Sequence, residues 1–95
     1  MKLLPLTEGR VAGTGTVTLT AHHSGGTFGG ALISTDGTNA AIVVVREDNA
    51  SGKQIFSIST KSPLFVTAPF NSESQVLYFS VTGTGGEAQL YEWAN

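Results

Sequence analysis

Apolar and polar residues alternate along most of the chain with a period of two, the spacing of a β-strand that buries one face. In residues 16–21, Val17 and Leu19 take one face and threonines take the other. No segment combines helix-forming residues with an apolar stripe at helical spacing. The pattern predicts strands at 16–21, 27–34, 40–46, 53–60, 75–82 and 87–93, and a short Pro-marked edge strand within 62–70.

The spacing of these segments predicts the fold class. Short strands separated by turns rich in Gly, Asn, Asp and Ser are typical of all-β domains. We expect a single antiparallel β-sandwich of jelly-roll type, with about seven short strands and no substantial helix. Residues 14–95 would form the sandwich, and residues 1–13 would be an N-terminal arm or a first strand. Ninety-five residues suffice for one domain.

Residues 40–45 (AAIVVV) break the alternation, because they are apolar at every position. Asp36-Gly37 before them is a strong turn signal, which predicts a hairpin between 27–34 and 40–46. Such a strand would have no polar face. The Pro-rich segment, the N-terminal arm or another polypeptide would cover its second side, or its valines would be apolar surface residues of the ordinary kind.

The N-terminal residues contain an apolar run, MKLLPL, followed by the glycine-rich GRVAGTG. This run is either the first strand of the sheet, a disordered end or an extension that docks onto a neighbouring chain. Together with the valine segment and the C-terminal aromatic residues, it supplies the predicted partner contacts. These are Leu3, Leu4, Leu6, Val43, Val45, Tyr91 and Trp93.

Composition narrows the classes of partner. Only 13% of the residues are charged, against about 25% in ordinary soluble proteins. The five basic residues are scattered, so no basic surface for nucleic acid is expected. No window approaches the roughly 20 apolar residues of a membrane span, and the N-terminal run is too short for a signal peptide. The neutral, hydroxyl-rich surface either tolerates weak colloidal repulsion or is largely covered by other chains.

Candidate catalytic and metal-binding residues do not form a recognisable pattern. The chain has no cysteine, which excludes disulfides and thiolate metal sites. His22 and His23 are adjacent, so on a strand they would point to opposite faces and could not share a metal. Asp36, Glu47 and several other carboxylates fall at predicted turns, where they stabilise the backbone. We therefore expect no metal, no cofactor and no enzymatic activity.

Several short motifs, taken in order, resemble a group of small β-sandwich proteins encoded by tailed bacteriophages. The resemblance covers residues 14–93. In that group the valine strand leads into an aromatic-Asp pair, whereas here it leads into Arg46-Glu47-Asp48. The motifs are Gly25-Gly26, STDGTNAA (34–41), the valine run, NASGK (49–53), APF (68–70), YFSVTGTG (78–85) and QLYEW (89–93).

The resemblance implies a virion structural protein of the capsid decoration or cement type. Such a protein would be made in the host cytoplasm and would bind the major capsid protein on the outside of the particle. It would form a symmetric homo-oligomer, with a trimer favoured. A receptor- or carbohydrate-binding module of a phage tail or fibre is the alternative, with Tyr78, Tyr91 and Trp93 as a platform for sugar rings.

Overall fold

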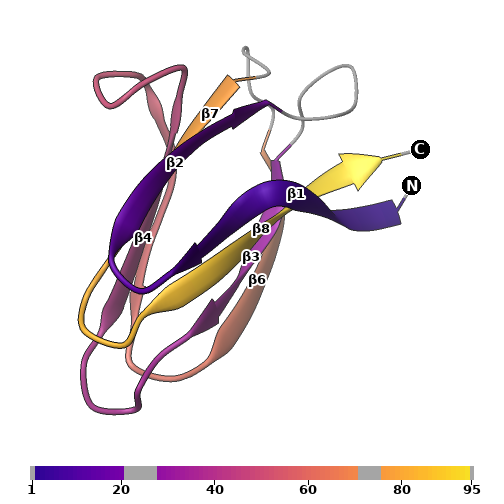
Figure 1. Cartoon of the computed structure of the whole chain (residues 1–95). Helices are drawn as coiled ribbons and strands as arrows, with labels where there is room; N and C mark the ends of the chain where they lie inside the picture. The colour runs from indigo at the N-terminus through magenta and orange to yellow at the C-terminus, as the bar shows by residue number, and fades with distance from the viewer. Residues whose placement is uncertain (1, 21–27, 71–75, 95) are drawn as a thin grey trace.

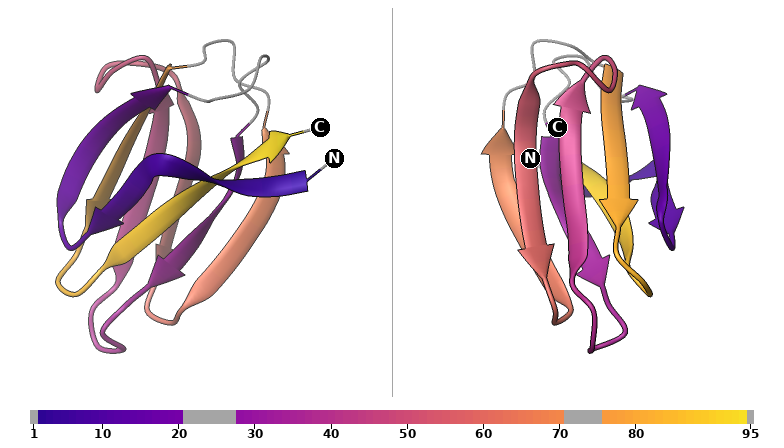
Figure 2. Two further views of the ribbon diagram at one scale, coloured as in Figure 1. Left: turned by 45° about the vertical axis from the view of Figure 1, so that its right-hand side comes forward. Right: turned by 90° about the vertical axis from the view of Figure 1, so that its left-hand side faces the viewer.

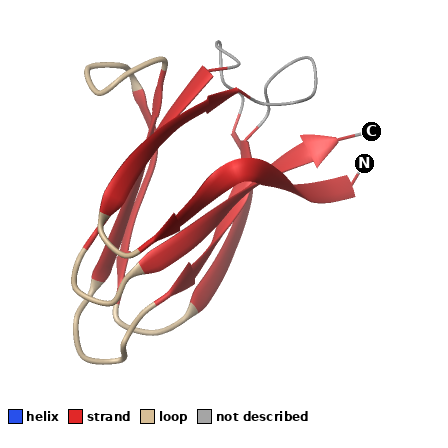
Figure 3. Cartoon of the chain, in the orientation of Figure 1, coloured by secondary structure: helices blue, strands red, loops and turns tan. Residues whose placement is uncertain are grey.

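The computed structural model describes residues 2–20, 28–70 and 76–94, and these residues form strands and turns without any helix (Figure 3). Among them, no helical segment has the length and apolar character needed to cross a bilayer. The prediction of an all-β fold is confirmed. The eight strands are β1 (Lys2–Ala12), β2 (Gly15–Thr20), β3 (Phe28–Ser34), β4 (Ala41–Glu47), β5 (Gln54–Thr60), β6 (Leu64–Phe70), β7 (Val76–Thr82) and β8 (Glu87–Ala94).

The strands form two four-stranded antiparallel sheets that pack face to face (Figure 1). One sheet has the order β1-β8-β3-β6 and the other has the order β2-β7-β4-β5. The pairs β1–β8, β2–β7, β3–β6 and β4–β5 are nested about the middle of the chain, as in a long hairpin wound around itself. This is the topology of a jelly roll, which the sequence had predicted.

Six of the seven connections pass from one sheet to the other, and only β4 and β5 follow each other within a sheet (Figure 2). Their turn is held by the Glu47 amide, which donates to the Lys53 carbonyl oxygen at 2.9 Å. The Ser51 amide donates to Asn49 Oδ1 at 2.8 Å. The central hairpin of the fold therefore turns through residues 48–53.

The predicted hairpin at Asp36-Gly37 is wrong, because β3 and β4 lie in different sheets. Gly37 does have a positive φ of 84°, as its place after Asp36 suggests. However, Asp36 Oδ1 accepts hydrogen bonds from the amides of Thr38 and Asn39, both at 2.8 Å. These bonds bend the chain from one sheet to the other, so the local turn signal is present without a hairpin.

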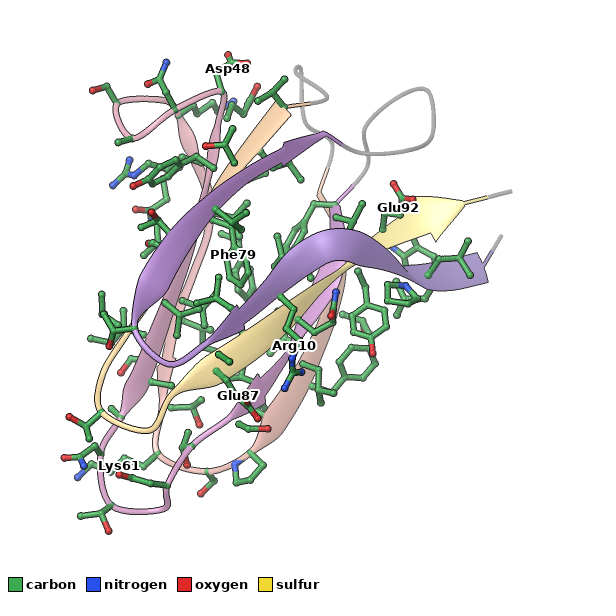
Figure 4. The ribbon with its side chains drawn as sticks, in the orientation of Figure 1. Arg10, Asp48, Lys61, Phe79, Glu87 and Glu92 are labelled. Carbon is green, nitrogen blue, oxygen red and sulfur yellow. The ribbon has the colours of Figure 1, made fainter. Side chains whose placement is uncertain are left out.

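The core fills the space between the two sheets. The largest side chains that are fully buried there are Phe28, Phe79, Leu6, Ile33, Leu77 and Leu90, and Figure 4 shows Phe79 between the layers. Phe28 meets Phe56 with ring centroids 5.2 Å apart, which links the sheets. Burial of these apolar side chains supplies most of the driving force for folding.

The valine segment has two different faces in the structure. Ala41, Val43 and Val45 point into the core and are at most 1% exposed. Ile42 lies on the outer face of the same strand and is 41% exposed, and Val44 is half-buried there. No described strand lies over this outer face. The second side of the apolar run is therefore the outer face of β4. Within the described residues, neither the Pro-marked strand β6 nor the N-terminal strand β1 covers it, because both belong to the other sheet.

The N-terminal run forms strand β1 and is paired with β8 of the same chain. Leu6 is 0% exposed and belongs to the core. The sequence left three alternatives for the N-terminal run: a first strand of the sheet, a disordered end or a docking extension. In the structure, Lys2–Ala12 is a strand of the sheet. A truncation of residues 1–6 would remove Leu6 from the core, so residues 2–6 are part of the folded domain.

Candidate functional site

The outer face of the sheet β1-β8-β3-β6 carries the aromatic residues of β8. Along this strand Ala88, Leu90 and Glu92 point inward and are at most 2% exposed. Because side chains alternate along a strand, Tyr91 and Trp93 point outward, and both remain partly exposed. The sequence of β8 thus places two large aromatic rings on one surface of the sandwich.

Neighbouring strands add apolar side chains to the same surface. Leu32 on β3 is directly opposite Phe65 on β6, and these side chains are 43% and 47% exposed. Leu3 on β1 is opposite Trp93. We call the outward set Leu3, Leu32, Phe65, Tyr91 and Trp93 the aromatic face. It spans all four strands of the sheet.

Two glycines in β3 provide the space in which this surface assembles. Gly30 is opposite Tyr91 on one side and Thr67 on the other. A Cβ there would collide with the Val66 carbonyl oxygen and lie 3.0 Å from Thr67 Cα. Tyr91 and Phe65 come from strands on either side of β3, yet their ring centroids are 5.2 Å apart in an edge-to-face arrangement. A Cβ at Gly29 would lie 2.5 Å from Leu3 Cδ1. The missing side chains therefore allow the backbone of β6 to approach Gly30 closely and leave space for Leu3 beside Gly29.

Polar residues border the aromatic face at its lower end. Arg10 on β1 pairs with Glu87 on β8, with 3.0 Å between Nη2 and Oε2, and Figure 4 shows the two side chains together. Gln89 lies beside them and donates from Nε2 to the Leu6 carbonyl oxygen at 2.8 Å. This bond holds the irregular segment of β1 between Pro5 and Arg10. An apolar centre beside a polar rim is the usual anatomy of a protein interface.

The structure separates the predicted contact residues into three groups. Leu3, Tyr91 and Trp93 lie together on the aromatic face. Leu4 is 37% exposed and lies opposite Glu92, on the inner side of the sheet at its end. The prediction needs correction for Leu6, Val43 and Val45, which are 0% exposed and fill the core. They are not accessible to another chain.

Sequence reasoning missed Leu32 and Phe65, the two most exposed members of the aromatic face. Both lie in apolar runs, at 31–33 and 64–66. In a strand such a run must direct one large apolar side chain away from the core. The signal was therefore present, but the pairing that joins Leu32 to Phe65 and Tyr91 required the sheet order.

The predicted sugar-binding platform of three rings is not assembled. Tyr78 lies on β7, in the opposite sheet, and its register partners there are Thr18 and Arg46. Tyr91 and Trp93 belong to the other sheet. Tyr78 therefore lies on one outer face of the sandwich, and Tyr91 and Trp93 lie on the opposite one.

Groups suited to chemistry are dispersed over the described residues. They contain no cluster of three His, Cys, Asp or Glu side chains that could hold a metal. Asp36 is engaged in its turn, where hydrogen bonds from the amide and side chain of Asn39 and from the amide of Thr38 lower its pKa. Glu47 Oε1 and Trp93 Nε1 are buried without a hydrogen-bond partner in the structure. They lie in different sheets and so do not form one site. His22 and His23 lie outside the described residues.

Comparisons with known proteins found no family model, no curated protein and no solved structure that matches this chain.

Proposed function

We propose that this chain is a non-enzymatic structural protein that attaches to the outer surface of a tailed-phage capsid through the aromatic face. The observation that carries the attachment is the set of outward apolar side chains on one sheet, in which Phe65 lies opposite Leu32 and contacts the ring of Tyr91. Exposed apolar patches with a polar border mark sites of protein contact. The order of the phage-like motifs along the sequence supports the capsid, and hence its major capsid protein, as the partner.

The composition of the aromatic face suits a protein partner. Tyr, Trp and Phe are enriched in the cores of interfaces, where charged residues are depleted. The five residues of the aromatic face are uncharged, and the Arg10–Glu87 pair at its border neutralises its own charge. Burial of a large apolar side chain contributes roughly 1.5–3 kcal/mol. Several such residues on one surface therefore provide affinity without strong charge steering.

A lattice of identical capsid subunits would multiply this modest affinity. Each bound copy that contacts two neighbouring subunits would oppose their separation, which is how a cement protein resists the pressure of packaged DNA. A jelly-roll sandwich suits this role because its sheet presents a broad, rigid surface. Fold alone does not identify a function, so the proposal rests on the face and on the motifs together.

The experiment is attachment to phage particles. Purified protein is mixed with capsids of the phage that encodes it, assembled without this chain, and the capsids are pelleted. We expect the unchanged protein and the control Ile42→Ser to pellet with the capsids, and the variant Leu32→Ser/Phe65→Ser to stay in solution. Ile42 is a suitable control because it is 41% exposed on the opposite sheet. Circular dichroism verifies that all three remain folded.

Two results would overturn the proposal. The first is an unchanged protein that neither pellets with these capsids nor occurs in purified particles. The second is equal attachment by the Leu32→Ser/Phe65→Ser variant, which would move the contact away from the aromatic face. Binding to a glycan array in place of capsids would favour the receptor- or carbohydrate-binding alternative.

A further inference from the structure

Strand β5 is an edge of the sheet β2-β7-β4-β5, and no other strand of the described residues pairs with its outer side. Alternate N–H and C=O groups of an edge strand have no partner in their own sheet, and proteins usually block such edges with charged residues, prolines or bulges. The sequence of β5, QIFSIST, contains no charge and no proline. The register of β5 shifts once, between Gln54 and Phe56, and is regular from Phe56 to Thr60. The edge strand β1 is interrupted by Pro5 and an irregular register, and Pro69 lies within the edge strand β6.

The side of the sandwich next to β5 is also open. Ile58 is opposite the fully buried Val43 and so points inward, yet it is only half-buried. Leu64 on β6 is opposite the fully buried Ile33 and is 39% exposed. Figure 2 shows β5 and β6 along the same side of the molecule. At the other side β1 lies against β2, and Val11 of β1 is 8% exposed.

We propose that a second copy of this chain binds along β5, in antiparallel orientation, and extends the sheet to eight strands across a twofold axis. Two observations independent of the aromatic face support the occupant. The outer side of β5 has no strand beside it in its own sheet, and such an edge is a template on which a second strand can pair along its length. In addition, β5 contains no charged residue, so two copies of this strand could pair without repulsion between like charges.

Charges beyond the ends of β5 select the register. Lys53 and Lys61 flank the strand. A pair centred on Ser57 would place Lys53 of one copy opposite Lys61 of the other at both ends, which is unfavourable. A pair centred on Ile58 avoids this contact. It places Ser57 opposite Ser59 of the second copy, and the two Ile58 side chains cover each other on the inner side.

This arrangement has a geometric consequence for attachment. A twofold axis perpendicular to the sheet β2-β7-β4-β5 leaves both copies of the other sheet on the same side. The dimer would therefore present two aromatic faces in one direction, and a flat array of binding sites could engage both, which raises the apparent affinity. A closed twofold contact also ends with two chains. The proposal replaces the trimer expected from the sequence resemblance with a dimer.

The first test is sedimentation velocity on charge variants. Ser57→Lys/Ser59→Lys would place lysines opposite each other twice in the Ile58-centred register. Its matched control, Thr16→Lys/Thr18→Lys, adds the same charge to the outward side of β2, at the other edge of the same sheet. We expect the unchanged protein and the control at the mass of a dimer, and the β5 variant at the mass of a monomer. A monomeric unchanged protein, or a dimeric β5 variant, would overturn the proposal.

The second test is a cross-link that does not depend on charge. The chain has no cysteine, so Ile58→Cys introduces a single thiol at the position on the twofold axis. Directly opposed residues in antiparallel strands lie about 4.5–5.5 Å apart at Cα, which suits a disulfide. We expect oxidation to give a covalent dimer for Ile58→Cys and not for Thr18→Cys on β2. Equal cross-linking of the two variants, or none for Ile58→Cys, would contradict the β5 contact.

The two proposals can fail separately. The variant Leu32→Ser/Phe65→Ser leaves β5 unchanged, so we expect it to remain a dimer while it loses capsid attachment. If this variant becomes monomeric and Ser57→Lys/Ser59→Lys does not, the copies meet through their aromatic faces, and the β5 contact is wrong.

Discussion

The ring of Tyr91 meets the ring of Phe65 edge-on, with 5.2 Å between centroids, although β3 separates their strands. The contact passes over Gly30, which is directly opposite Tyr91. Edge-to-face pairs of this kind stabilise by about 0.5–1.5 kcal/mol beyond the burial of their area. A glycine in the interior of a strand normally weakens it. Here it lets the backbone of β6, the strand that carries Phe65, approach β3 closely.

Replacement of Gly30 by alanine should destabilise the fold and disturb the aromatic face. Gly30 has a φ of 147°, and an added Cβ would collide with the Val66 carbonyl oxygen and lie 3.0 Å from Thr67 Cα. Strained backbone positions of this type cost about 1–3 kcal/mol for other residues, and the collision adds to that. Chemical denaturation would measure the loss. Gly13→Ala is the control, because Gly13 also has positive φ but nothing lies within 4 Å of its Cβ position.

For Gly30→Ala, near-UV circular dichroism would report the packing of Tyr91 directly. The contrary result is a free energy of unfolding that Gly30→Ala lowers no more than Gly13→Ala does. That result would show that β6 moves away from the added Cβ without cost, and the close approach at Gly30 would then not matter for stability.

Leu6 and Leu4 should respond very differently to truncation. Leu6 is 0% exposed in the core, whereas Leu4 is 37% exposed. A buried leucine replaced by alanine lowers the free energy of unfolding by about 2–5 kcal/mol. We therefore expect a large fall for Leu6→Ala and a clearly smaller one for Leu4→Ala in urea denaturation. Similar values for the two variants would mean that β1 detaches from β8 in solution and that residues 1–13 act as an arm.

The turn at Asp36 should make stability depend on pH in the acid range. Hydrogen bonds from Asn39 and Thr38 lower the pKa of Asp36 in the folded protein, so the unfolded chain takes up the proton first. This contribution is present above the ordinary aspartate pKa of about 3.9 and is lost as pH falls through the lower folded value. Melting temperatures of the unchanged protein and Asp36→Asn should differ at neutral pH and converge as pH falls below that range.

The variant Asp36→Asn keeps one side-chain oxygen as an acceptor, which isolates the effect of the charge. A difference in melting temperature that stays constant between neutral and strongly acid pH would show that the carboxylate charge contributes nothing to this turn.

The positions of the strands could be predicted from sequence alone, because alternation is a local property of each segment. The predicted strand at 53–60, for example, is β5 (Gln54–Thr60), and that at 87–93 lies within β8 (Glu87–Ala94). The Pro-marked segment is the edge strand β6, as expected from residues that cannot donate to a neighbour. The strands follow from the apolar side chains that each segment must bury, and the edge position follows from prolines that cannot donate a backbone hydrogen bond. The number and spacing of such strands predicted the jelly-roll class.

Strand pairing and the assembly of the aromatic face depended on the tertiary structure. Asp36-Gly37 specifies a bend, but not which strand lies beside β3, since the same bend can cross between sheets. An uninterrupted run such as Ile42–Val45 contains no polar residue to mark its outer side, so only packing against the opposite sheet decided that Val43 and Val45 are buried and Ile42 is exposed. Phe65 and Tyr91 are 26 positions apart in the chain, and their contact exists because β6 and β8 flank the same strand. Hydrophobic burial is not directional, so local sequence could determine the strands, whereas the choice of partners and of outer faces required the whole fold.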